Sequence, residues 1–283
     1  MNPFRIASSA LLAGLLITTP QTYCQNKTGK KIRWERERIA PGLVWKSSHT
    51  LAVDSVPQNI NMLQINTRKR TVSVVYDRER NVLTSNQASA AGALAAVNGG
   101  FFDIRNGGSV TYIRTAGIIN DGDTARKWKP NPNYNGSILV DNRRHFHIMP
   151  FMGNRWYDIH QEYTDVLVTG PLLVQNRIKV TLPETSLVSN RHPRTCAATA
   201  KRSKVLLVTV DGRTSQSAGM TLEQLASLML ILRCRDAVNL DGGGSTTMWI
   251  TGKPYNGVVN MPCDNKIFDH EGERAVSNII AVK

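Results

Sequence analysis

The chain is 283 residues long, enough to bury a sizeable core, and its apolar content of 41% and charged content of 20% are typical of a globular protein. This composition excludes a wholly disordered chain and a protein with many membrane spans. The 35 Lys and Arg residues outnumber 21 Asp and Glu, and the formal net charge of +14 favours anionic partners, although a basic surface that serves only solubility explains it equally well. Nucleic acid is not an expected partner, because the basic residues are scattered in pairs and accompany no nucleic-acid motif.

The N-terminus has the pattern of a signal peptide. Arg5 precedes a short apolar run at residues 6–17, which is too short to span a bilayer comfortably and is followed by polar residues. We therefore expect residues 1–24 to be a signal peptide and the protein to be exported to the periplasm or the cell exterior, without integral membrane association. Lipid attachment at Cys24 is not expected, because the residues before it lack the small side chains of a lipid-attachment site.

A polar N-terminal segment is expected at residues 25–49. Its first part, up to about residue 35, contains little to bury and is expected to be poorly ordered. Further along, the alternation of Arg and Glu at residues 33–38 indicates a surface strand or an extended arm. The folded catalytic domain is then expected at residues 50–283.

Strand and helix patterns alternate along the first half of this domain. Residues 60–65 and 72–76 predict a hairpin, since two apolar runs flank a short polar connection. Residues 87–94 are rich in Ala and predict a helix that leads into a short apolar strand. Residues 106–136 predict long loops with one strand at residues 110–113.

The second half of the chain predicts more strands than helices. A helix is expected at residues 221–233, with Thr221 as its N-cap and apolar residues at helical spacing that face a sheet. Strands are expected at residues 166–168, 172–175, 196–200, 205–210, 237–240, 248–250 and 277–282. Many strands with few helices predict the α+β class, with a mixed, mostly antiparallel sheet, a few packed helices and a single catalytic domain.

The strongest local pattern is residues 239–247 (NLDGGGSTT), where a strand runs into three glycines and three hydroxyl side chains. Asp241 stands at the end of the strand, and the glycines let successive N–H groups approach one anionic oxygen closely. A tight hairpin turn is the alternative explanation. A nucleotide phosphate loop and the nucleophile elbow of serine hydrolases are excluded here, since neither a Lys-Ser/Thr pair nor the G-x-S-x-G spacing is present.

Two further strand ends carry polar side chains. Asp211 follows an apolar strand as Asp241 does, so two carboxylates could converge as acid, base or nucleophile in glycoside cleavage, although an Asp-Gly pair is also a common turn. Asn98 follows another short strand, and its amide can both donate to and accept from a sugar hydroxyl, with Gly99 and Gly100 leaving space in front of it. Turn chemistry is the competing explanation here too.

A basic segment precedes one of the expected strands. Residues 191–195 (RHPRT) bring two guanidinium groups and the His192 imidazole together, and Arg194 is suited to bidentate binding of phosphate oxygens. Taken alone, a solvated basic loop is the simpler interpretation.

Neither metal nor disulfide chemistry is required by the sequence. His145 and His147 fall on one face of an expected strand, but no third ligand stands at a suitable spacing, so surface or core histidines are favoured over a metal pair. No cofactor is therefore required, and a structural divalent cation stays an open alternative. Cys196, Cys234 and Cys263 match no zinc spacing, and both disulfide bonds and unbridged thiols stay open for them.

Six segments in order resemble the phosphodiester glycosidase family, the family of N-acetylglucosamine-1-phosphodiester α-N-acetylglucosaminidase, and its bacterial members above all. They are residues 96–102 (AVNGGFF), 169–173 (TGPLL), 191–195 (RHPRT), 211–222, 239–246 (NLDGGGST) and 274–278 (RAVSN). The resemblance implies an exported hydrolase that cleaves the bond between the anomeric carbon of a sugar and a phosphodiester. The candidate sugar is N-acetylglucosamine, and the candidate targets are cell-surface or exopolysaccharide glycans. Two alternatives stay open, namely a non-catalytic module that binds an anionic polysaccharide and a phosphoesterase that cleaves P–O bonds.

Carried over by position, the resemblance implies that Asp241, and after it Asp211, serve in catalysis, with Arg194 balancing the charge of the phosphate. The residues expected to bind substrate are Asn98, Gly99, Gly100, His192, Thr195, Arg213, Gly242, Gly243, Gly244, Ser245 and Thr246. The chain departs from the family in having Gln224 where Glu is usual and Cys-Ala-Ala at residues 196–198, and Glu223 is the candidate substitute for the missing Glu.

Overall fold

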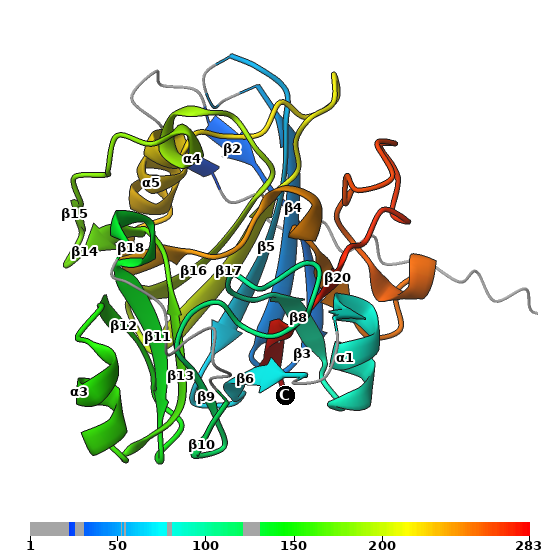
Figure 1. Ribbon diagram of the computed structural model, residues 1–283. Coiled ribbons are helices and arrows are strands. Elements are labelled where there is room, and N and C mark those ends of the chain that lie inside the picture. Colours follow the sequence, from blue (N-terminus) through cyan, green and yellow to red (C-terminus); the bar gives the residue numbers. More distant parts are fainter. Residues whose placement is uncertain (1–22, 26–30, 52, 54, 78–80, 121–130) are drawn as a thin grey trace, which may run out of the picture.

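The structure is a computed structural model, and it describes residues 23–25, 31–51, 53, 55–77, 81–120 and 131–283 (Figure 1). Almost all of the expected signal peptide, residues 1–24, lies outside these ranges. Among the described residues, no helix is both long enough and apolar enough to cross a membrane.

The largest layer is an eight-stranded sheet with the strand order β15-β14-β18-β16-β17-β5-β4-β3. Its strands are β3 (Glu35–Ala40), β4 (Leu43–Thr50), β5 (Gln58–Asn66), β14 (Leu172–Gln175), β15 (Ile178–Lys179), β16 (Arg194–Ala200), β17 (Lys204–Val210) and β18 (Cys234–Asn239). Every neighbouring pair in it is antiparallel.

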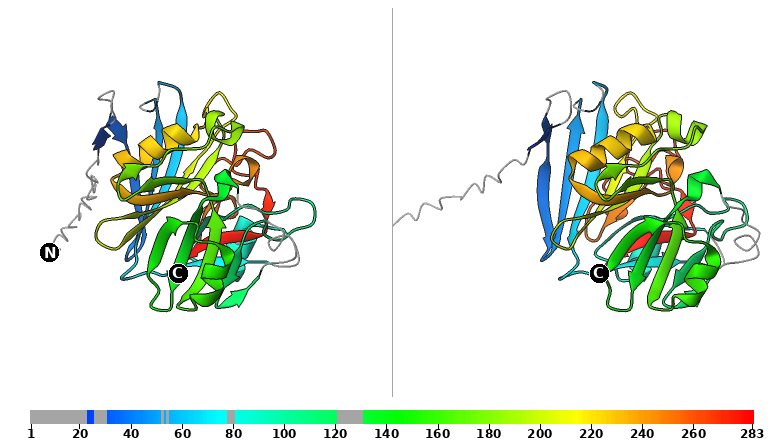
Figure 2. Two further views of the ribbon diagram at one scale, coloured as in Figure 1. Left: turned by 60° about the vertical axis from the view of Figure 1, so that its left-hand side comes forward. Right: turned by 90° about the vertical axis from the view of Figure 1, so that its left-hand side faces the viewer.

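Two smaller antiparallel sheets lie beside the large one (Figures 1 and 2). The four-stranded sheet, in the order β19-β8-β21-β6, contains β6 (Val72–Tyr76), β8 (Ala95–Asn98), β19 (Met248–Ile250) and β21 (Asn278–Val282). The five-stranded sheet, in the order β10-β9-β13-β11-β12, contains β9 (Ile113–Thr115), β10 (Ile118–Ile119), β11 (Gly136–Asp141), β12 (Phe146–Pro150) and β13 (Tyr163–Thr169). Two short pairs complete the strands: β1 (Tyr23–Gln25) with β2 (Lys31–Arg33), and β7 (Val82–Leu83) with β20 (Ala275–Val276).

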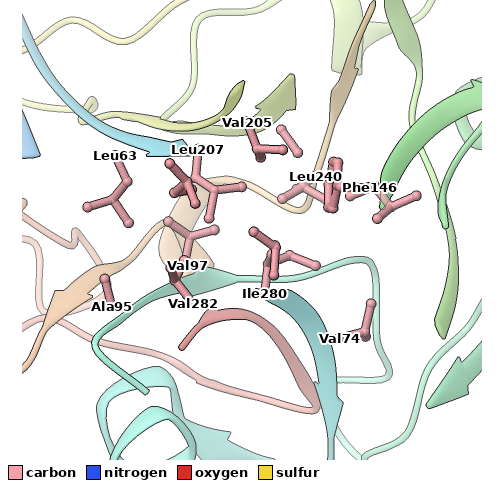
Figure 3. Close-up of a cluster of buried hydrophobic side chains, with 14 of the residues drawn as sticks. Leu63, Val74, Ala95, Val97, Phe146, Val205, Leu207, Leu240, Ile280 and Val282 are labelled. Carbon is pink, nitrogen blue, oxygen red and sulfur yellow. The ribbon is translucent and has the colours of Figure 1, made fainter. Parts of the chain in front are cut away.

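One apolar core is shared by all three sheets. Leu63 and Leu207 come from the large sheet, Val97 and Ile280 from the four-stranded sheet, and Phe146 from the five-stranded sheet, and all are buried together (Figure 3). Because this core removes one face of each sheet from water, it fixes how the sheets lie against one another.

Helices cover the remaining sheet faces. The helix α5 (Leu222–Ile231), with α4 (Ser186–Ser189) beside it, packs on the second face of the large sheet, where its leucines and Met229 join Cys196 and Val208. The helix α1 (Thr84–Ala90) packs on the four-stranded sheet, and α3 (Asn154–Ile159) contributes Tyr157 to an apolar cluster on the five-stranded sheet. Three single 3₁₀ turns occur at η1 (Pro132–Tyr134), η2 (Gly243–Ser245) and η3 (Tyr255–Gly257).

The expected mostly antiparallel arrangement with few helices is confirmed, and so are all the strands expected in the second half of the chain. The hairpin expected from residues 60–65 and 72–76 is wrong. β5 pairs with β4 and β17 in the large sheet, whereas β6 pairs with β21 in the four-stranded sheet. A local apolar pattern identifies a strand but does not specify its partner, which here comes from the far end of the chain. The helix expected at residues 87–94 is α1, which begins and ends a little earlier than predicted. The strand expected at residues 110–113 lies at Ile113–Thr115.

Two expectations for the N-terminal part of the chain also need correction. They are poor order up to about residue 35 and a domain that begins at residue 50. Ile32 is 0% exposed and Trp34 is 5% exposed, so this part of the polar segment packs into the core beneath α5. The surface strand expected at residues 33–38 is confirmed as β3, whose first four residues are exposed, and β4 follows it in the large sheet. The sheet thus includes residues 35–50, which the expected domain start at residue 50 left out.

Cys196, Cys234 and Cys263 are buried thiols, and no disulfide joins Cys196 to Cys234. Burial raises the pKa of the Cys196 thiol well above its ordinary value, so this side chain behaves as a core residue.

The start of α5 has the expected N-cap. The Thr221 hydroxyl accepts the Gln224 N–H at 3.2 Å, and the Gln224 side-chain oxygen accepts the Thr221 N–H at 3.0 Å, which together form a capping box. The Gln at position 224 therefore does what a Glu would do at the same helix position. Glu223 is exposed and pairs with Lys179 on the surface, so it does not replace the missing Glu in a site.

We expect Thr221→Ala to lower the free energy of unfolding by about 1 kcal/mol, because it leaves the Gln224 N–H at the start of α5 without its acceptor. Urea denaturation of the purified protein measures this change. Ser227→Ala, a change at an exposed position on the same helix, serves as the control. An equal effect of both substitutions would contradict the contribution of the capping box.

Candidate active site

Four strand ends meet at one edge of the structure. In the large sheet Arg194 lies opposite Val210 and Cys196 opposite Asn239, so the start of β16 lies beside the ends of β17 and β18. Asp211 directly follows β17, and Asp241 follows β18 after one intervening residue. The end of β8 reaches the same place from the four-stranded sheet through Asn98. The expected convergence of these four polar residues is therefore present.

Asn98 is 0% exposed and joins the two sheets with its side-chain amide. Its Nδ2 donates to the backbone oxygen of Asp241 at 2.7 Å, and its Oδ1 accepts from the Thr195 hydroxyl at 2.6 Å and from the Thr247 N–H at 3.2 Å. Both Asn98 and Thr195 are thus used inside the protein, where they position the loop that carries Asp241. The sequence led us to expect that these groups would face a sugar, but here they bind other parts of the protein.

The guanidinium of Arg194 is also buried, at 1% exposure. Its Nε donates to the backbone oxygen of Met220 at 2.8 Å, and one Nη donates to those of Leu187 and Asn190 at 2.7 Å each. Burial lowers the pKa of Arg194 to about 10, with a further decrease from the charge of Arg213. The edge of the fork that was expected to bind phosphate is therefore occupied by backbone carbonyls. Arg194 thus holds α4 and the residue after it together with the loop before α5.

Asp211 is, after Arg194, the second buried residue of this site with a titratable side chain, at 1% exposure. Its carboxylate accepts from Asn59 Nδ2 at 2.6 Å, from Asn260 Nδ2 at 2.7 Å and from the Met261 N–H at 3.0 Å. Burial raises the pKa of Asp211 to about 7 although these three donors lower it. The carboxylate is thus surrounded by donors of the protein and holds the segment around Asn260 in place.

Asp241 differs from these three residues because it is partly exposed. Its Oδ1 accepts the Gly242 N–H at 2.9 Å, and its own N–H donates to the Gly99 oxygen at 3.0 Å. Burial raises the pKa of Asp241 to about 6, and the Ser245 hydroxyl, the Gly242 N–H and the charge of Arg274 offset part of that increase. A carboxylate with this pKa can change its protonation state near neutral pH, which suits a catalytic base or nucleophile.

The glycines after Asp241 bring two arginines close to it. Gly243 has a φ of +62°, and a Cβ at this position would lie 3.0 Å from Arg213 Nη2. A Cβ at Gly244 would collide with Arg274 and Asp264, whose side chains pair with each other. Gly242 instead packs against the Pro193 oxygen. The three glycines therefore allow close packing by a basic cluster on one side and by backbone on the other.

The expected anion nest of backbone N–H groups is not formed by this loop. The Gly242 N–H donates to Asp241 Oδ1 and the Gly243 N–H to the Pro193 oxygen, while the Ser245 and Thr246 N–H groups donate back to the loop itself. Ser245 and Thr246 are buried, so their side chains lie beneath the loop. Positive charge at this site comes from side chains.

Arg213 and His192 lie together next to the loop. Arg213 is exposed, and its Nη2 lies 3.4 Å from His192 Nδ1. Burial, followed by the charges of Arg194 and Arg213, lowers the pKa of His192, so the imidazole is neutral at pH 7. Both residues were expected in the site, and the structure brings them to its exposed side.

Gly99 and Gly100 have a packing role. The Gly99 N–H donates to the Asn278 backbone oxygen at 2.9 Å and the Gly100 N–H to Asn278 Oδ1 at 2.6 Å, and a Cβ on Gly99 would collide with Asn278. They permit close approach of β21 rather than leaving space for a sugar.

Sequence reasoning missed Arg274 and Tyr134 as members of the site. Arg274 lies in the matched ending at residues 274–278, so its position in that motif was a usable signal. Tyr134 comes from a loop-rich stretch without a motif, packs its ring 4.7 Å from that of Phe101, and has its pKa raised by burial and then by the charge of Asp241. In the text that follows, Asp241, Arg213, Arg274 and His192 are called the Asp241 cluster.

A sequence model of the family described as phosphodiester glycosidase matches residues 91–283. The chain belongs to the phosphodiester glycosidase family. This confirms the resemblance found in the six segments, and the matched range contains every member of the Asp241 cluster.

Solved structures with the same fold include a member with a named activity. The zebrafish N-acetylglucosamine-1-phosphodiester α-N-acetylglucosaminidase catalytic domain, auto-inhibited by its pro-peptide, matches with a TM-score of 0.67 and 19% identity over 92% of this chain and 91% of that one. A hypothetical protein from Synechocystis matches with a TM-score of 0.66 and 14% identity over 88% of this chain and 63% of that one. At these identities the similarity shows the fold.

A match to a Bacillus subtilis (strain 168) protein is shorter. The SPbeta prophage-derived uncharacterized protein YomE is 37% identical over 68 residues, which are 24% of this chain and 11% of that protein. The chain therefore spans only a small part of the length of this relative.

The burial of Asp211 leads to a test that separates positioning from catalysis. At pH 5, below the pKa of about 7, we expect Asp211→Asn to lower the free energy of unfolding by about 1.5–3 kcal/mol, because an amide NH₂ would face groups that donate to the carboxyl group. The loss should be smaller at pH 8, because ionisation of the buried carboxyl above its raised pKa already destabilises the unaltered protein. Asp241→Asn, the same chemical change at a partly exposed position, should cost less stability. Urea denaturation of both variants makes the comparison, and an Asp211→Asn protein of unchanged stability that has lost all turnover would indicate a catalytic role instead.

Proposed function

We propose that the protein is an exported glycosidase that hydrolyses the bond between the anomeric carbon of a sugar and a phosphodiester oxygen. Its family supports the reaction class. The observation that carries the proposal is the partly exposed Asp241 carboxylate, with a pKa of about 6, beside the exposed Arg213 and the half-buried Arg274. The signal-peptide pattern of residues 1–24 supports export, and N-acetylglucosamine in cell-surface or exopolysaccharide glycans is the candidate substrate.

A single reactive carboxylate is enough for this reaction. The group that departs from the sugar is a phosphate monoester anion, which is stable without a proton from a general acid. The demanding part is the oxocarbenium-like carbon, for which a carboxylate must act as nucleophile or activate a water molecule. Asp241 can do either. The buried and fully hydrogen-bonded Asp211 is then not required as the second carboxylate of an ordinary glycosidase pair.

The arginines of the Asp241 cluster fit the phosphate. The Arg213 fork is exposed, with only weak partners at 3.4 Å and 3.9 Å in His192 and Cys263, so it can exchange them for phosphate oxygens. Arg274 pairs with Asp264 but also lies close enough to Asp241 to lower the pKa of that carboxyl. Two guanidiniums beside the reacting carboxylate would attract the diester and stabilise the charge that develops on the leaving phosphate.

The test is turnover of N-acetylglucosamine-1-phosphodiesters in ¹⁸O-labelled water. The proposal expects a reducing sugar that carries the label and an unlabelled phosphate monoester, which mass spectrometry and phosphorus NMR distinguish. Asp241→Asn should lower kcat by roughly a hundredfold to ten-thousandfold while substrate binding, measured by calorimetry, persists. Glu162→Gln, the same type of change at an exposed carboxylate just before β13, is the control.

Other results would replace the proposal with a defined alternative. Label in the phosphate would mean cleavage of a P–O bond by a phosphoesterase. Binding without turnover in the unaltered protein, across several sugar-1-phosphodiesters, would mean a polysaccharide-binding module.

The raised pKa of Asp241 predicts the pH dependence. The carboxyl must be ionised to act, so kcat/KM should be fully developed above the pKa and should fall as the pH drops through about 6. Because the charge of Arg274 lowers this pKa, Arg274→Gln should move the acidic limb of the profile to higher pH. Arg235→Gln, at an exposed arginine at the opposite end of β18, should leave the limb unchanged. An acidic limb that Arg274→Gln does not move would assign the titration to another group.

A further inference from the structure

A second group of side chains meets at the hairpin between β11 and β12, outside the Asp241 cluster. Asp141 ends β11, His145 lies in the turn that follows, and His147 lies on β12. Asp141 Oδ2 is 3.0 Å from His145 Nδ1 and 3.1 Å from His147 Nε2, and all three atoms lie within 4.8 Å of one another. The structure thus supplies a third potential ligand beside the two histidines. Sequence spacing did not reveal it, because Asp141 reaches them only when the chain turns back.

We propose that Asp141, His145 and His147 bind a divalent transition-metal ion, with Zn²⁺ as the best fit. Two imidazole nitrogens and one carboxylate oxygen are donors that Zn²⁺ takes in three-ligand sites, where a water molecule fills the fourth position. With Zn–N and Zn–O bonds of about 2.0–2.2 Å, neighbouring ligands in a tetrahedral site are roughly 3.3 Å apart. Asp141 Oδ2 lies 3.0 Å and 3.1 Å from the two ring nitrogens, which is already close to that value. Imidazole donors favour such ions over Mg²⁺ and Ca²⁺.

The carboxylate of Asp141 is oriented before any ion binds. Its Oδ1 accepts the N–H groups of Arg143 at 2.9 Å and His145 at 2.8 Å, which turns Oδ2 toward the two rings. These two hydrogen bonds fix the orientation of the carboxylate, which is the role that outer hydrogen bonds have for ligands in metal sites.

The three side chains are accessible to an ion from solvent. The His145 side chain is 63% exposed and that of His147 is 43% exposed, while the ring of Tyr163 packs edge-on at 5.9 Å from His147 and limits its rotation. Arg143 and Arg144 in the same turn are exposed, so solvent screens their repulsion of a cation.

The site is separate from the Asp241 cluster. Asp141 ends β11, whereas Gly136 at the start of β11 packs against Leu172 and Val238, on the strands next to the Asp241 loop. An ion at Asp141 would join two strands at the edge of the five-stranded sheet and take no part in the reaction. The inference therefore holds or fails independently of the proposed function.

The test uses protein without a polyhistidine tag, stripped with a chelator, exchanged into metal-free buffer and titrated with Zn²⁺ in a calorimeter. We expect one Zn²⁺ per chain, and at least about tenfold weaker binding in His147→Gln. In ¹⁵N-labelled protein, Zn²⁺ should shift His145 Nδ1 and His147 Nε2. His160→Gln is the matched control, because His160 contacts Glu162 at 2.9 Å in a similar histidine–carboxylate pair but lacks a second imidazole.

Three results would overturn the inference. They are no measurable binding of Zn²⁺, binding that His147→Gln and His160→Gln weaken equally, and binding without shifts of the two named nitrogens. In each case the cluster would be a hydrogen-bonded surface group only.

Discussion

The buried amide of Asn98 is the contact on which the Asp241 cluster depends. It connects the end of β8 to the backbone of Asp241 on one side and to Thr195 of β16 on the other. An amide at 0% exposure is stable only with its donors and acceptors paired, since an unpaired buried polar group costs about 1–3 kcal/mol. The two sheets and the loop after β18 must therefore keep one relative position, and the Asp241 carboxylate is fixed as a consequence.

Around this contact, buried and exposed charges have different tasks. Arg194 and Asp211 direct their charged groups at backbone and amide partners inside the protein, where they hold the loops before α5 and around Asn260. Asp241 and Arg213 are left at the exposed side, where a substrate can reach them. An active site needs such a supporting layer, because a reacting carboxylate works only when its neighbours keep its position and its pKa.

The sequence predicted where the site lies better than it predicted what each residue does. Apolar runs that end in Asp211, Asp241 and Asn98 were visible as strand ends, and antiparallel pairing brings such ends together. The direction of a side chain depends on tertiary contacts that no local pattern contains. For that reason Arg194 was expected to bind phosphate although its donors go to carbonyls. Arg274 was missed because the Asp241 loop, which it approaches, lies in another part of the sequence. Asp141 was missed because it reaches the two histidines only when the chain turns back.

The same reason explains the errors in the fold. The partner of β6 is β21, which is separated from it by most of the chain, so the short connection between residues 60–65 and 72–76 indicated a hairpin that does not form. Polar residues hid β4 and left β3 outside the expected domain, because strands at or next to the edge of a sheet need few apolar side chains. By contrast, α5 and its N-cap were predictable, since helical spacing and a capping box are properties of adjacent residues.

The raised pKa of Asp241 results from two opposing effects at the same position. Burial alone favours the protonated acid, while the Ser245 hydroxyl, the Gly242 N–H and the charge of Arg274 favour the carboxylate, and the balance gives a pKa of about 6. A fully exposed aspartate would be ionised but weakly basic, and a fully buried one without a nearby cation would stay protonated and inert at neutral pH. The close approach of Arg274 that Gly244 permits therefore adds to the two hydrogen bonds that keep this carboxyl ionised. The three glycines thus act on Asp241 through packing, because they let basic side chains approach the loop closely.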